Sequence, residues 1–168
     1  NNYHLSVFAW LKQHPDIHIP KIIQFEEKNE KLIVLEEYID GITLEQLLVH
    51  EISMRERKDI LNQIFDGISY LHHADPSIIH RDIKPQNIFY GVDGSVKLSD
   101  FGISVIKGSL MNVDENNKVV GTAQYLAPEI FRGGKPSFQS DIFSLGILFF
   151  EIVTGRVPFD AKTPGEVG

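Results

Sequence analysis

The order of apolar and polar positions along the chain predicts short strands first and longer helices later. Apolar runs at 21–25 and 31–38 are separated by the polar segment 26–30, which indicates two strands joined by a turn. Two further apolar runs, 88–90 and 96–98, flank a turn that contains glycine and indicate a hairpin. Strands and helices that occur in separate parts of the chain are typical of the α+β class.

Helix starts can be located from capping signals. Ser53 is followed three residues later by Glu56, and the apolar residues after them recur at helical spacing, so a long amphipathic helix is predicted over 54–73. Thr43 and Gln46 form the same kind of capping box, which predicts the start of a shorter helix after Thr43.

The most apolar part of the chain, 139–154, predicts a buried helix that ends at Gly155. Its apolar centre is too short to span a bilayer and contains Glu151, so we expect no membrane segment within this sequence. The start of the chain does not resemble a signal peptide, and the sequence contains no cysteine for disulfides. We therefore expect a cytoplasmic location.

Size and charge limit the class of protein further. A chain of 168 residues with 42% hydrophobic residues can form one compact domain with a core. Its formal net charge of −7 disfavours binding to nucleic acid. No feature of the sequence indicates an oligomeric state.

Two short motifs carry the candidate chemistry. Residues 79–87 read Ile-His-Arg-Asp-Ile-Lys-Pro-Gln-Asn, and residues 99–102 read Ser-Asp-Phe-Gly. They supply an aspartate to orient a hydroxyl, a lysine to neutralise a phosphate, and two residues to hold metal, which phosphoryl transfer requires. Together with Ala-Pro-Glu at 127–129, they resemble the signature of eukaryotic-like (Hanks-type) serine/threonine protein kinases, in a style that looks bacterial. The resemblance runs from about 11 to 167.

The resemblance implies a role for each motif residue. Asp82 would be the catalytic base, Lys84 would contact the transferred phosphate, and Thr122 would hold both in place. Asn87 and Asp100 would hold Mg²⁺, or Mn²⁺ in its place, because hard cations prefer oxygen ligands. Each residue alone could be an ordinary turn or surface residue, but their joint spacing favours catalysis. ATP would be the phosphate donor, and serine or threonine hydroxyls of proteins would be the acceptors.

The segment 37–41 resembles the hinge that binds adenine in these kinases. Backbone groups near Glu37 and Ile39 would then hydrogen-bond the adenine ring, and Phe89 would pack under it. Lys84 and Asn87 would complete the nucleotide contacts on the phosphate side.

The resemblance also implies an architecture. Residues 1–37 would be a remnant of the β-rich N-lobe, and residues 38–168 would be the hinge and the helical C-lobe, truncated before its last helices. His80 would pack in the core, and Asp141 would anchor the backbone of the catalytic loop. Glu129 would belong to a buried ion pair whose arginine partner is not in the sequence.

Parts of the family's nucleotide clamp are missing. The sequence contains no Gly-x-Gly-x-x-Gly loop and no Val-Ala-Ile-Lys-like lysine before the hinge. The family's helix glutamate would fall near His4 or Leu5, yet no Asp or Glu precedes Asp16. We therefore expect this fragment to be inactive by itself. Two alternatives to an active protein kinase stay open, namely a pseudokinase that binds or scaffolds, and a kinase-fold phosphotransferase that acts on small molecules.

Overall fold

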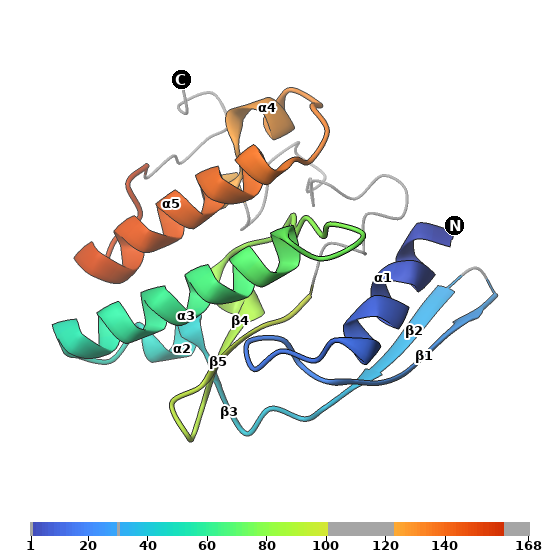
Figure 1. Ribbon diagram of the computed structural model, residues 1–168. Coiled ribbons are helices and arrows are strands. Elements are labelled where there is room, and N and C mark those ends of the chain that lie inside the picture. Colours follow the sequence, from blue (N-terminus) through green and yellow to red (C-terminus); the bar gives the residue numbers. More distant parts are fainter. Residues whose placement is uncertain (1, 30, 101–122, 160–168) are drawn as a thin grey trace.

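The computed structural model describes residues 2–29, 31–100 and 123–159, which form helices packed around two small antiparallel sheets (Figure 1). The helices are α1 (Asn2–Gln13), α2 (Leu44–Leu47), α3 (Met54–His72), α4 (Pro128–Phe131) and α5 (Phe138–Thr154). The strands are β1 (Ile22–Lys28), β2 (Lys31–Glu36), β3 (Gly41–Thr43), β4 (Ile88–Gly91) and β5 (Val96–Leu98). Short 3₁₀ turns lie at Pro85–Asn87 and Ala123–Tyr125. The fold is α+β, as the sequence predicts.

The first sheet is the hairpin of β1 and β2, which pair from Ile22 opposite Glu36 to Lys28 opposite Lys31. This confirms the two predicted strands. Helix α1 packs against β1 (Figure 1), and the rings of Phe8 and Phe25 meet with their centroids 6.0 Å apart. The hairpin therefore buries one apolar face against the helix.

The second sheet contains the predicted hairpin of β4 and β5, with β3 added at its edge. Strand β3 was not predicted, because it is only three residues long and pairs with a strand that is distant in sequence, Thr43 opposite Phe89. Its first residue must be glycine, since a Cβ atom on Gly41 would lie 2.2 Å from the carbonyl oxygen of Tyr90.

Both predicted capping boxes are present. Ser53 Oγ accepts the N–H of Glu56 and Glu56 returns a bond to the N–H of Ser53, so α3 begins where the sequence predicts. Thr43 and Gln46 do the same at the start of α2. A third box, which the sequence analysis missed, starts α5 at Ser137 and uses serine instead of glutamate at its fourth position.

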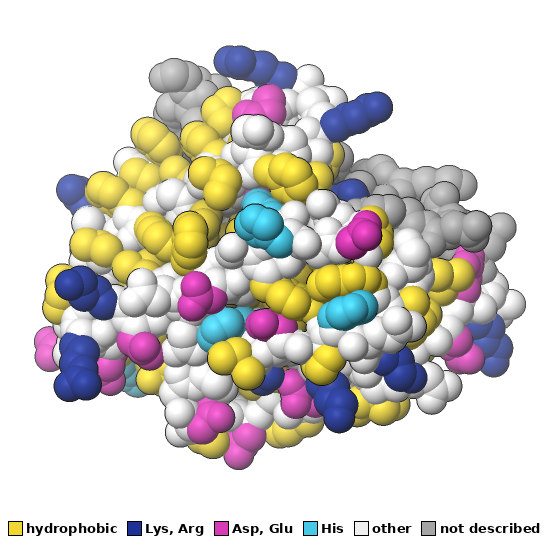
Figure 2. All heavy atoms as spheres, in the orientation of Figure 1, with side chains coloured by type: hydrophobic (Ala, Val, Ile, Leu, Met, Phe, Trp, Pro, Cys, Tyr) yellow, Lys and Arg dark blue, Asp and Glu magenta, His cyan; other side chains and the backbone are white. Residues whose placement is uncertain are grey.

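Helix α5 ends at Gly155, whose φ of 78° is left-handed, as predicted. The prediction that this helix is buried is only partly right. One side is buried, but the other exposes Phe138, Ile142, Phe150 and Val153, and Figure 2 shows hydrophobic side chains gathered over this helix. On that side, the ring of His72 contacts Phe138 with centroids 4.7 Å apart, whereas the sequence pattern reports only that the segment is apolar.

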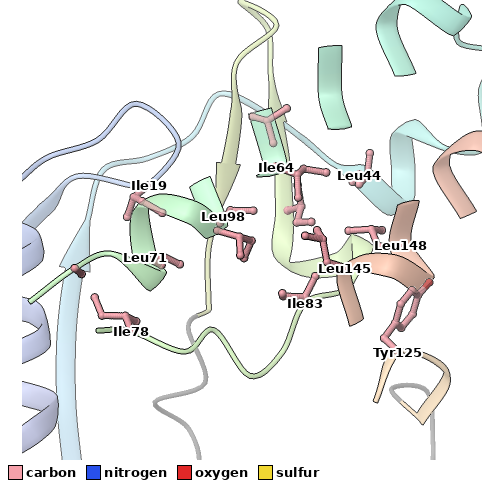
Figure 3. Packing of buried hydrophobic residues seen from close by; sticks show 14 of the residues in the cluster. Ile19, Leu44, Ile64, Leu71, Ile78, Ile83, Leu98, Tyr125, Leu145 and Leu148 are labelled. Carbon is pink, nitrogen blue, oxygen red and sulfur yellow. The ribbon is translucent and has the colours of Figure 1, made fainter. Parts of the chain in front are cut away.

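The main core lies between α3, α5 and the second sheet (Figure 3). Its fully buried members include Leu44, Ile60, Ile64, Ile68, Leu71, Ile88, Leu98, Leu148 and Ile152. The start of α3 contacts the end of α5, where the guanidinium of Arg57 donates to the carbonyl of Ile152, so the two helices run antiparallel. Among the described helices, none is both long and apolar enough to cross a bilayer.

Candidate active site

The loop between α3 and β4 is fixed by one buried carboxylate. Asp141, near the start of α5, is 1% exposed. Its Oδ2 accepts the backbone N–H of His80 at 2.8 Å, and its Oδ1 accepts the backbone N–H of Arg81 at 2.9 Å. The expected anchoring of the loop by Asp141 is therefore confirmed. His72 at the end of α3 reaches the same carboxylate, with Nε2 2.8 Å from Oδ2.

Arg81 has an unusual backbone conformation. Its φ of 73° is left-handed, which costs a non-glycine residue about 1–3 kcal/mol and persists only where surrounding contacts offset that cost. The bond from its N–H to Asp141 is such a contact. His80 beside it is fully buried, and this burial lowers the pKa of its imidazole, although nearby carboxylates including Asp141 and Asp82 act in the opposite direction. His80 is thus a packed, neutral residue, as expected.

Two predicted site residues, Lys84 and Asn87, converge on the carboxylate of a third, Asp82. Lys84 Nζ lies 3.1 Å from Asp82 Oδ2, and Asn87 Nδ2 donates to the same oxygen at 2.7 Å. Asn87 Nδ2 also donates to the backbone carbonyl of Asp82 at 2.9 Å. The carboxylate of Asp82 is therefore held in one orientation by a cation and an amide, while its side chain stays 32% exposed and can be reached by a substrate.

The geometry around Asn87 fits a metal site made with few protein ligands. Because the amide nitrogen of Asn87 points at Asp82, its oxygen is directed elsewhere and can serve as a donor to a cation. The N–H of Ser99 donates to the backbone carbonyl of Asn87 at 2.9 Å, which brings the next residue, Asp100, to the same region. No cluster of three His, Cys, Asp or Glu suited to metal occurs in the described part of the chain. Mg²⁺ does not need one, because it commonly uses one or two protein oxygens together with phosphate and water.

The predicted hinge residues follow β2 and lead to β3. Loss of water around the carboxyl group raises the pKa of Glu36, although the residue as a whole is exposed, and Asp100 and Glu37 act in the same direction. The end of β2 therefore lies within electrostatic reach of Asp100. Phe89, predicted to lie under adenine, is half-buried in β4.

Sequence reasoning missed the ion pair of Glu37 with Lys97, whose side chains meet at 2.8 Å. The two residues are far apart in sequence, and no local pattern links them.

The resemblance singled out two further residues, Thr122 and Glu129. Thr122 and residues 101–121 lie outside the described residues, so the structure does not place them. Glu129 is exposed in the described structure, and the arginine with which it was expected to pair is not in the sequence, so that ion pair stays a prediction. The short helix α4 instead turns Ile130 into the core.

Known proteins resemble this chain along nearly its whole length. The family described as protein kinase domain matches residues 5–167. The serine/threonine-protein kinase PrkC of Bacillus subtilis is 37% identical over 152 residues, covering 89% of this chain and 23% of that protein. The probable serine/threonine-protein kinase PknB of Lactococcus lactis is 37% identical over 153 residues, with the same coverage of 89% and 23%. The PknB of Mycobacterium tuberculosis is 39% identical over 136 residues, covering 80% and 22%. The chain spans about a quarter of the length of these relatives.

Proposed function

Because this chain belongs to the protein kinase domain family, with bacterial serine/threonine kinases among its relatives, we propose that its parent protein transfers the γ-phosphate of ATP to serine or threonine hydroxyls of proteins. The observation that carries the proposal is the carboxylate of Asp82, which Lys84 and Asn87 hold while leaving it accessible. Phosphoryl transfer depends mainly on positioning and on charge stabilisation, and this cluster supplies both.

Each residue of the cluster has a distinct task in the proposed reaction. Asp82 orients the acceptor hydroxyl and receives its proton. Lys84 places its ammonium group beside Asp82, where it offsets negative charge on the phosphate in transfer. Asn87 and Asp100 would hold Mg²⁺, or Mn²⁺, and such an ion supplies positive charge to the phosphate oxygens. Thr122, which lies outside the described residues, would hold Asp82 and Lys84 in place.

The nucleotide would bind between the two sheets. We place adenine against the backbone near Glu37 and Ile39, with Phe89 below the ring. Residues 1–37 then act as the N-lobe portion, and residues 38–168 as the hinge and C-lobe portion. This ATP-dependent activity belongs in the cytoplasm, where ATP is available.

Residues 1–168 alone should transfer little phosphate, since they contain no glycine-rich loop and no Val-Ala-Ile-Lys-like lysine before the hinge to position the phosphates of ATP. One observation supports a second candidate, a pseudokinase that binds or scaffolds. Helix α1 contains no Asp or Glu that could pair with such a lysine. The intact cluster around Asp82 favours the active enzyme over this candidate. A small-molecule phosphotransferase is the third candidate.

The test uses the full-length protein with radiolabelled ATP, Mg²⁺ and a generic protein substrate. Beside it we would assay Asp82→Asn, with Asp66→Asn on the exposed part of α3 as the matched control. Phosphoserine or phosphothreonine that is lost only in Asp82→Asn supports the proposal. Binding of ATP without any transfer supports the pseudokinase, and transfer confined to small molecules supports the third candidate.

A further inference from the structure

Lys97 joins the second sheet to two segments of the first half of the chain. It lies in the middle of β5, and its Nζ is 2.8 Å from Glu37 Oε1. The same ammonium group donates to the backbone carbonyl of Ile17 at 3.0 Å. One side chain thus links β5, the end of β2 and the loop that follows α1.

Glu37 is held from more than one side. Its Oε1 also accepts the backbone N–H of Lys21 at 3.0 Å, and its own N–H donates to the carbonyl of Lys21 at 2.9 Å. The hydrogen bond from Lys97 is the main cause of a lowered pKa for the Glu37 carboxyl group, so this group is ionised at neutral pH. Backbone and side chain of Glu37 are both fixed by these contacts.

This pair lies between the two sheets, next to the hinge and on the strand that leads to Asp100. In the described residues, no strand pairing connects the sheet of β1 and β2 with the sheet of β3, β4 and β5. The Lys97–Glu37 pair spans that gap. Glu37 is the first residue after β2, and Lys97 precedes Asp100 by three residues on the strand that leads to it.

We propose that the Lys97–Glu37 ion pair is a latch that sets the distance between the hinge and Asp100, which makes both side chains positioning residues for the nucleotide. The inference rests on the proposed function, in which adenine binds near Glu37 and phosphates bind near Asp100. A ligand that must contact both places binds better when their separation is fixed beforehand, because less order has to be created on binding.

Because the pair is partly exposed, it adds little to the free energy of unfolding. Its exposure does not prevent it from fixing the distance between the hinge and Asp100. The side chains of Lys97 and Glu37 are 18% and 34% exposed, so the pair resembles a surface salt bridge in its screening by solvent. Its partners, however, come from separate elements, and the backbone bonds at Ile17 and Lys21 restrict its geometry. Removing the pair should therefore affect nucleotide binding more than folding.

The experiment is a double-mutant cycle in the full-length protein, with Lys97→Met, Glu37→Gln and the double variant. The Michaelis constant for ATP should rise about fivefold in Lys97→Met, near the upper limit for a partly exposed pair, while kcat changes little. The double variant should be no worse than Lys97→Met, because both changes remove the same latch. Lys58→Met, at an exposed lysine of α3, is the matched control.

Thermal unfolding of every variant shows whether a higher Michaelis constant for ATP arises in a protein that is still folded. An unchanged Michaelis constant in Lys97→Met, additive effects in the cycle, or tighter ATP binding after the pair is removed would each overturn the latch. These results leave the proposed function intact, since they presuppose an active wild-type protein. Failure of the proposed function would show itself differently, as absence of phosphate transfer by the wild type.

Discussion

Replacing Asp141 with alanine should loosen the loop that carries Asp82 and lower the free energy of unfolding. The carboxylate of Asp141 is buried and accepts the backbone N–H groups of His80 and Arg81 at 2.8 and 2.9 Å. The substitution leaves both donors without their acceptor, and it also removes the partner of His72 Nε2.

The size of the effect can be worked out from these contacts. A buried donor that loses its acceptor costs about 1–3 kcal/mol, and two backbone donors are affected here. Part of this cost is recovered when Arg81 relaxes from its left-handed φ of 73°, which is worth about 1 kcal/mol. We therefore expect a net loss of about 3 kcal/mol, within the range found when one member of a buried polar network is removed.

Urea unfolding followed by circular dichroism measures this loss, and hydrogen exchange of the peptide 79–87 locates it. Asp66→Ala, on the exposed side of α3, is the control. The exchange rate of the loop peptide should rise by about a hundredfold in Asp141→Ala, since each 1.4 kcal/mol is a factor of ten. A loss of stability no larger than the roughly 0.5 kcal/mol of a surface substitution would refute the reasoning.

Three other predictions concern packing, a partly buried hydrogen bond and pH. Gly67→Ala should lower the melting temperature, because the new Cβ would lie 2.8 Å from Cδ1 of the buried Leu98 and overpacking costs about 1–3 kcal/mol. A higher melting temperature would contradict the packing described. Tyr125→Phe removes the donor to Glu151 Oε2 (2.6 Å) and should cost about 1–2 kcal/mol in urea unfolding, whereas equal stability would show that the bond contributes nothing. The folded-state pKa of Glu37 is lowered, so its contribution is complete above its ordinary pKa and is lost as pH falls through the lowered value. Wild type and Glu37→Gln should accordingly converge in stability in acid, and a difference that grows there would contradict this sign.

Local sequence signals predicted α2, α3, α5 and both hairpins, because their information lies within a few residues, but the apolar pattern was not used to predict α1 or α4. Ser53 and Glu56 define the start of α3, and Gly155 defines the end of α5. Strand β3 was missed because its pairing partner is distant in sequence. The start of α5 was placed one residue late, because Ser137 and Ser140 form a box without the usual glutamate or glutamine.

The candidate site was predictable in its residues but not in its contacts. The motif around Asp82 indicated which residues take part, and the structure brings Asp82, Lys84 and Asn87 together. Spacing alone could not reveal that Lys97 pairs with Glu37, because the contact depends on how the two sheets are placed. The ion pair of Glu129 was inferred from resemblance alone and needs an arginine that the sequence does not contain; in the described structure Glu129 is exposed beside the buried Ile130.

The three capping boxes of α2, α3 and α5 have a consequence for the order of folding. Each box joins residues only three positions apart, so it can form as soon as its own segment is synthesised. The contacts that shape the catalytic loop join His80 and Arg81 to Asp141, about sixty residues later in the chain. Helix starts should therefore form early and persist in partly folded states, whereas the geometry around Asp82 should appear last and be lost first when the domain loosens.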